Sequence, residues 1–120
     1  MVHDLLRGIP FAIVLLGMAG SGVMADDRCA QGYVWREATP QDHVCVTPGI
    51  RAQVRDDNAR AASRISTSDR TYGSDTCAPG FVWRGATPQD HVCVTPGTRA
   101  QSRADNAQAQ RRRAGVVSFD

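Results

Sequence analysis

A twelve-residue segment, ATPQDHVCVTPG, occurs twice in this chain without a change, at positions 38–49 and again at 86–97. Extending the comparison at the same offset of 48 residues aligns positions 29–64 with 77–112, and 27 of these 36 positions are identical. A fixed period of this size indicates that one structural unit has been duplicated. A unit of under ~40 residues rarely buries enough apolar surface to fold unaided. Each unit therefore needs a cross-link or a partner.

Four cysteines supply candidate cross-links, because Cys29 and Cys45 recur as Cys77 and Cys93 at the same spacing. In an exported chain, an even number of cysteines at repeated spacing favours disulfides. Four cysteines allow three pairings, of which the repeat favours the local one, Cys29 with Cys45 and Cys77 with Cys93. Each bridge would close a loop of about 15 residues and stabilise its unit by roughly 3 kcal/mol.

Zinc binding is the alternative use of the same residues. Cys29, Asp42, His43 and Cys45 are all zinc ligand types. Their spacing lacks the C-x-x-C arrangement that makes a zinc site recognisable from sequence. We therefore predict disulfides, with no metal and no cofactor.

The N-terminus has the features of a secretory signal peptide. An apolar run, IPFAIVLLGM at positions 9–18, follows Arg7 and precedes small residues that end at Ala25. The alternative is a membrane anchor, but the run is shorter than the ~20 apolar residues that a spanning helix needs. We predict a signal peptide over residues 1–25, and a secreted or periplasmic mature chain with no stable membrane span.

The charge pattern gives no sign of a nucleic-acid partner. The net charge is +2, and all fourteen basic residues are arginine. Positive and negative side chains are mixed along most of the sequence, so no broad basic face is expected. The one basic run, Arg111–Arg113, is more typical of the solvated end of a helix than of a binding patch.

Each repeat predicts a hairpin followed by a helix. Tyr33–Arg36 and His43–Val46 are rich in strand formers and are separated by a turn that contains Pro40. Thr47 then Pro48 form a helix start, with Thr as the N-cap and Pro in the first turn. The predicted fold is a small disulfide-rich α+β protein of two tandem modules, each a β-hairpin followed by an α-helix.

The predicted organisation after the signal peptide has four parts. Module 1 covers residues 29–64, a linker rich in Ser, Thr, Asp and Gly covers 65–76, module 2 covers 77–113, and a tail covers 114–120. The sequence does not decide whether the modules are independent or pack together.

The differences between the copies orient the predicted helix. Ile50 and Val54 of module 1 become Thr98 and Ser102, an exchange that suggests a face outside the deep core. We therefore expect the shared side of the helix to dock on the hairpin, with Arg51 or Arg55 able to lie over Trp35. That side carries Arg51, Ala52, Arg55, Asn58 and Ala59.

One repeated set of side chains could bind a ligand. An aromatic ring with a guanidinium, a carboxylate and an imidazole nearby suits a sugar or a peptide, and two copies would add avidity. The alternative is that the tryptophans form the core and the Arg–Asp pairs lie on the surface, where they would contribute little. The candidate residues are Trp35, Arg36, Asp42 and His43, with Trp83, Arg84, Asp90 and His91.

Catalysis is not predicted. Asp42 and His43 are neighbours in a strand and therefore point to opposite faces, and the repeats share no serine or free cysteine that could act as a nucleophile. We therefore assign no catalytic residue.

The repeats, GYVWREATPQDHVCVTP and GFVWRGATPQDHVCVTP, resemble the short Cys-bounded repeats of a group of uncharacterised exported bacterial proteins. The resemblance covers both repeats and implies export and modularity, but no reaction. Our leading hypothesis is a small secreted or periplasmic protein that acts as a non-catalytic binding or envelope-associated module for a glycan or peptide. The alternatives are a purely structural secreted protein, or a small metal-binding protein or hydrolase.

Overall fold

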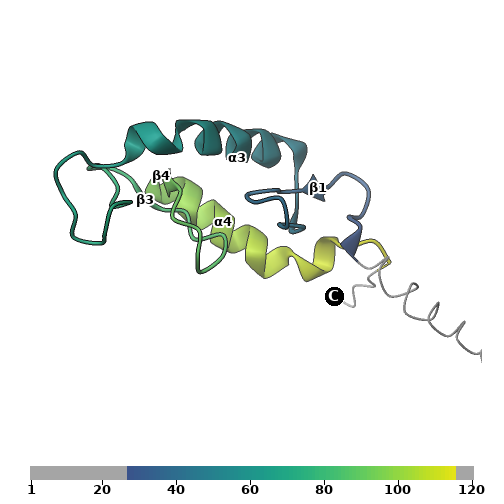
Figure 1. Cartoon of the computed structure of the whole chain (residues 1–120). Coiled ribbons are helices and arrows are strands. Elements are labelled where there is room, and N and C mark those ends of the chain that lie inside the picture. Colours follow the sequence, from purple (N-terminus) through teal and green to yellow (C-terminus); the bar gives the residue numbers. More distant parts are fainter. Residues whose placement is uncertain (1–26, 116–120) are drawn as a thin grey trace, which may run out of the picture.

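The computed structural model describes residues 27–115. It confirms the predicted α+β fold, with two hairpins that are each followed by a helix (Figure 1). The predicted signal peptide and residues 116–120 of the tail lie outside the described residues. Across 27–115, no helix combines the length and the apolar character needed to cross a membrane. Module 1 contains β1 (Val34–Trp35), β2 (Cys45–Val46), α3 (Pro48–Arg60) and the 3₁₀ turn η2 (Ala61–Arg64), and module 2 contains β3 (Val82–Trp83), β4 (Cys93–Val94), α4 (Pro96–Gln108) and η3 (Gln110–Arg112).

Both hairpins are antiparallel, and their regular pairing is shorter than predicted. Val34 pairs with Val46 and Trp35 with Cys45, and module 2 repeats this register. Hydrogen bonding continues past the strands, since the N–H of Glu37 donates to the carbonyl of Asp42 at 3.1 Å. Glu37 has a φ of 54°, and Gly85 at the same place has 64°. This left-handed residue ends the strand geometry and starts the turn.

The predicted helix start is confirmed. The Oγ1 of Thr47 accepts a hydrogen bond from the N–H of Ile50, and Pro48 occupies the first turn. Thr95 and Pro96 do the same for α4. The cap satisfies one of the backbone N–H groups that a helix start leaves without an intrahelical partner.

The predicted disulfides are also confirmed. Cys29 is bonded to Cys45 and Cys77 to Cys93, each across 16 positions of sequence. Cys45 and Cys93 are buried beside Val46 and Val94. A separate apolar cluster is small and consists of Ala38, Val54 and Ala86, with Ile50 packed against it.

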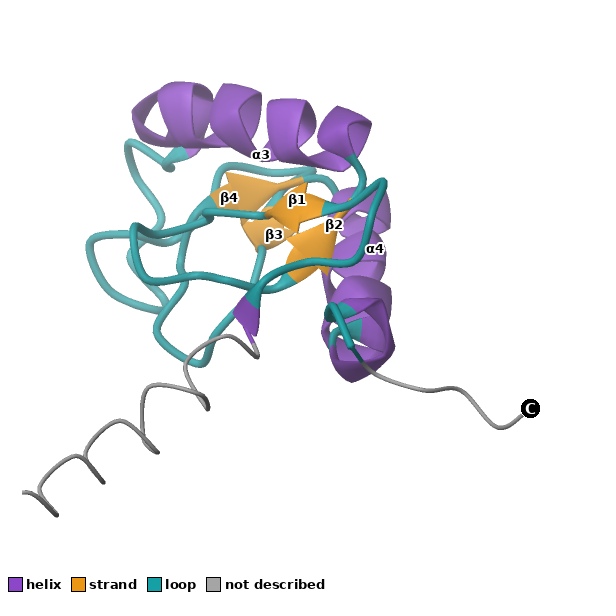
Figure 2. Cartoon of the chain, turned by 90° about the vertical axis from the view of Figure 1, so that its right-hand side faces the viewer, coloured by secondary structure: helices purple, strands orange, loops and turns teal. Residues whose placement is uncertain are grey.

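The two modules pack against each other reciprocally (Figure 2). The N–H of Ala78 donates to the carbonyl of Arg64 at 2.8 Å, and the N–H of Ala30 donates to the carbonyl of Arg112 at 2.8 Å. The end of each helical segment therefore meets the start of the other module. The guanidinium of Arg64 also lies 4.9 Å from the centre of the Phe81 ring, and that of Arg112 lies 5.1 Å from the Tyr33 ring. These contacts relate the modules by an approximate twofold axis.

The segment between the modules takes part in this packing. The N–H of Ser66 donates to the carbonyl of Thr76 at 2.8 Å, and both residues are buried. Residues 65–76 therefore form a hydrogen-bonded loop that closes on itself, not a loose tether.

The predicted orientation of the helix is wrong. Val54 of α3 is only 4% exposed and Asp57 is buried, whereas Ala52 and Ala59 are exposed. Val54 and Ser102 lie at equivalent places in the interface between modules, so their difference marks an asymmetric core and not a surface face. Of the predicted docking residues, Asn58 does contact the hairpin, through a bond to the carbonyl of Ala38 at 3.3 Å. The side chain that stacks on Trp35 is His43, and neither Arg51 nor Arg55 takes that place.

Candidate functional site

The predicted ligand-binding residues separate into a buried charged pair and a half-exposed aromatic pair in each module. The Nε of Arg36 donates to Asp42 Oδ2 at 2.7 Å, and its Nη2 donates to Oδ1 at 3.2 Å. Arg84 and Asp90 repeat this geometry at 2.7 and 3.1 Å. All four side chains are buried, so the alternative that pictured a weak surface pair is wrong.

The buried pair organises the hairpin turn. Asp42 Oδ2 also accepts from the N–H of Ala38 at 2.9 Å, and Oδ1 accepts from the N–H of Val44 at 3.3 Å. One carboxylate thus holds both strands and the turn between them. Because buried charges are costly unless paired and hydrogen-bonded, this network ties the hairpin geometry to the ionised state of Asp42.

The stability of the protein should fall in acid because of Asp42. Burial is the largest single influence on this carboxyl and opposes its ionisation, but the hydrogen bonds and charge of Arg36 together with the N–H groups of Ala38 and Val44 outweigh it and lower its pKa below the ordinary 3.8. As the pH drops, protons therefore bind the unfolded chain first. The contribution of Asp42 is complete above the ordinary value and is lost as the pH falls from about 4 through the folded pKa.

Urea unfolding at a series of pH values measures this effect. The free energy of unfolding should decline below about pH 4, and Asp42→Asn should give a shallower decline. An identical acid slope in the variant would exclude Asp42 as its source.

The aromatic pair is a stacked Trp–His plate. The rings of Trp35 and His43 lie 3.7 Å apart at 14°, and those of Trp83 and His91 lie 3.6 Å apart at 11°. Trp35 and Trp83 are half-buried. Full exposure would favour ligand binding and full burial would favour a structural role, and the observed burial lies between the two. Figure 1 places the two hairpins between the helices.

Each plate is held by an aspartate that sequence reasoning missed. The Nε1 of Trp35 donates to the carbonyl of Asp27 at 2.7 Å, and His43 Nδ1 lies 2.9 Å from Asp27 Oδ2. Asp75 holds Trp83 and His91 in the same way, at 2.9 and 2.6 Å. The signal was present in the sequence, because Asp27 and Asp75 are identical residues at the repeat offset, just ahead of the assigned module starts.

Module 2 has an aromatic groove of about 330 Å³ beside its plate. Tyr72, from the connecting loop, is 72% exposed, and its ring stands edge-on to Trp83 with centroids 6.0 Å apart. Phe81, Asp69 and Arg99 also line the groove. The connecting loop thus adds a second aromatic side chain to the predicted Trp platform.

Arg99 differs from its counterpart in module 1. Arg51 lies 3.7 Å from the carboxylate of Glu37, but module 2 has Gly85 in place of that glutamate. Within residues 27–115, the guanidinium of Arg99 has no ion-pair partner. Arg99 and Trp83 also line a second groove of about 410 Å³ that includes Arg103 and His91. The two grooves therefore share Trp83 and Arg99, and the exposed charge around them is mainly positive.

Within the described part of the chain, no group of three Asp, Glu, His or Cys side chains is arranged so that it could hold a metal ion. The sulfurs of Cys29 and Cys45, which the zinc alternative needed as ligands, are bonded to each other. The fold and the grooves define a small, two-module, disulfide-bonded α+β protein. Module 1 has a groove of about 260 Å³ lined by Tyr33, Trp35 and Arg51, and the groove of module 2 differs from it by the added ring of Tyr72.

Comparisons with protein-family models, with curated proteins and with solved structures each found no match.

Proposed function

We propose that this protein is an exported, non-catalytic binding module that holds an acidic glycan in the two grooves at Trp83. The observation that carries the proposal is the exposed ring of Tyr72 set against Trp83, next to Arg99, which has no ion-pair partner within residues 27–115. Exposed aromatic rings combined with a few convergent polar groups are typical of ligand-binding sites.

The lining chemistry suits a sugar that bears a carboxylate. The flat rings of Tyr72 and Trp83 offer apolar surface to a sugar ring, and Arg99 offers a fork of donors to a carboxylate. Asp69 lies on the same groove, where hydrogen bonds from the hydroxyl and the N–H of Thr71 lower its pKa below the usual range. An ionised Asp69 would accept hydrogen bonds from sugar hydroxyls. Two adjoining grooves fit a chain of several sugar units better than a single one.

Export is supported by the disulfides and by the N-terminal sequence pattern. Disulfides form and persist in oxidising compartments such as the periplasm and the extracellular space. The resemblance of the repeats to exported bacterial proteins points the same way, and we place the protein in the periplasm or outside the cell.

Calorimetric titration with hexagalacturonate, with cellohexaose as the neutral comparison, tests the proposal. We expect saturable binding that is tighter for the acidic chain. Arg99→Ala should weaken binding about tenfold or more, because a hydrogen bond to a charged group contributes roughly 1.5–3 kcal/mol. Tyr72→Ala should also weaken binding, by removing one wall of the groove.

The duplication provides matched controls. Arg51→Ala should leave the affinity unchanged, because Arg51 lies in module 1 and is already paired with Glu37. Gly85→Glu should weaken binding by giving Arg99 the partner that Arg51 has, and Glu37 shows that the turn accepts this residue. An affinity for hexagalacturonate that is unchanged in both Tyr72→Ala and Arg99→Ala would contradict the proposal. Binding of acidic peptides alone would replace the glycan, and no binding to either would favour a purely structural protein.

A further inference from the structure

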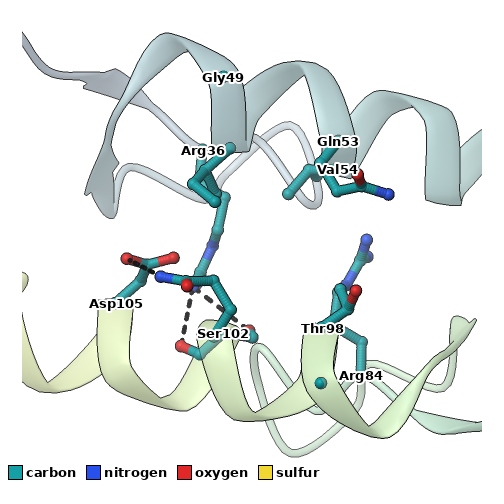
Figure 3. Close-up of a pocket in the computed structure, with 11 residues that line it drawn as sticks. Arg36, Gly49, Gln53, Val54, Arg84, Thr98, Ser102 and Asp105 are labelled. Atoms are coloured by element: carbon teal, nitrogen blue, oxygen red, sulfur yellow. Dashed lines mark hydrogen bonds between the residues drawn. The ribbon is translucent and has the colours of Figure 1, made fainter.

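A second candidate site lies away from the aromatic grooves, in a cleft of about 310 Å³ between α3 and α4 (Figure 3). The first turns of both helices line it, through residues that include Gly49, Ile50 and Gly97. Arg36 and Arg84 enter it from the two hairpins and extend in opposite directions. Its volume is at the lower end of the range of small-molecule sites, roughly 300–1,000 Å³.

The two arginines occupy equivalent positions but are not equally satisfied. Arg36 Nη1 lies 3.4 Å from the carbonyl oxygen of Ser102 and 3.5 Å from its hydroxyl. The residue that faces Arg84 from the equivalent place on α3 is Val54, whose side chain cannot accept a hydrogen bond. Arg84 is 1% exposed, and its Nη1 has no hydrogen-bond partner anywhere in residues 27–115.

An unsatisfied buried donor on a charged group is rare and destabilising, so its presence calls for a partner. The other donors of Arg84, Nε and Nη2, are already held by Asp90, which leaves Nη1 to face the cleft. One acceptor oxygen at this place would complete the set of contacts that Ser102 provides for Arg36.

The surroundings favour an anion with a short apolar part. Both helices begin at the cleft, and helix N-termini carry partial positive charge. The one acidic side chain on the cleft wall is Asp105. Its Oδ1 lies 2.9 Å from Arg112, which offsets the negative charge, and its Oδ2 has no hydrogen-bond partner within residues 27–115. Val54 lies next to Arg84 in Figure 3, and Ile50 lines the same cleft and packs against the apolar cluster that contains Val54.

We propose that this cleft binds a small aliphatic carboxylate, with one carboxylate oxygen accepting a hydrogen bond from Arg84 Nη1 and the aliphatic part lying on Ile50 and Val54. No bond is made or broken in this binding. None of the residues that line this cleft lines either of the two grooves proposed for the glycan.

The test is a methyl-detected NMR titration of the full exported chain with butyrate, with butyramide as its neutral analogue of the same shape. We expect saturable shifts at the methyl groups of Ile50 and Val54, with butyrate binding at least tenfold more tightly than butyramide. Equal affinity for the two probes, or shifts that never saturate, would overturn the proposal and leave a cleft that holds only water.

The duplication again supplies the matched variants. Val54→Ser places near Arg84 the hydroxyl that Ser102 places near Arg36, so it should weaken butyrate binding at least tenfold. Ser102→Val should retain butyrate binding, because it leaves Arg84 unchanged. Tyr72→Ala should also leave butyrate binding unchanged while it impairs the glycan site, so the two sites can fail separately. Unaltered affinity for butyrate in a folded Val54→Ser protein would contradict the role of Arg84. If Val54→Ser does not fold, the comparison of butyrate with butyramide on the wild-type protein still tests the proposal.

Discussion

Replacing Asp90 by alanine is expected to lower the free energy of unfolding by about 3–5 kcal/mol, because it leaves the buried guanidinium of Arg84 without a counter-charge. Arg84 has no second acceptor to fall back on, since its Nη1 is already unpartnered in residues 27–115. Small domains are stable by only about 5–15 kcal/mol, so the variant should lose a large share of its stability. Urea denaturation followed by tryptophan fluorescence measures the loss.

Asp42→Ala is the matched comparison. It removes the same interaction in module 1, but Arg36 keeps its contacts with Ser102. The loss should therefore be smaller than for Asp90→Ala. A loss below about 1 kcal/mol in both variants would show that the buried pairs contribute no more than surface ion pairs do.

The second large effect is expected from the disulfides. Replacing Cys77 and Cys93 together by alanine should cost about 3 kcal/mol, because the bridge restricts a loop of about 15 residues in the unfolded chain. The apolar core is too small to absorb this loss easily. The bridge also anchors the preceding part of the chain, since Cys77 pairs with Ile65, the first residue after module 1.

Because of that contact, the whole described chain should unfold in one transition, and the variant should lower its midpoint without splitting it. Calorimetry measures both the midpoint and the number of transitions. The Cys29 and Cys45 double variant is the control and should cost a similar amount. Two separate transitions in the wild-type protein would refute the mutual support of the modules.

The fold within each module could be predicted because its signals are local. The cap at Thr47 and the proline after it act over a few residues, and the cysteine pairing stays within one repeat, across 16 positions. All three predictions are confirmed. The packing between modules depends on contacts such as Arg64 with the carbonyl of Cys93, whose partners lie far apart in sequence. Arg64 and Arg112 are identical at the repeat offset, but identity within a duplicated unit does not tell which module a side chain will meet.

The candidate site was predictable only in part. Strand alternation placed Asp42 and His43 on opposite faces, and in the structure Asp42 is buried against Arg36 while His43 stacks on Trp35. The helix face was misjudged because a difference between copies was taken as a sign of exposure, whereas Val54 and Ser102 are both buried. Tyr72 could not be assigned, because it lies in the connecting loop and has no equivalent in the aligned repeat.

The approximate twofold packing bears on how the proposed binding surface differs between the two modules. In a symmetric dimer of one module, every substitution would occur twice. Removing the glutamate that pairs with the arginine of one subunit would also remove it from the other subunit. In the joined chain the halves vary independently, so Gly85 could replace glutamate beside Arg99 while Glu37 stayed beside Arg51. One half can then serve as scaffold and the other as receptor within a single short polypeptide.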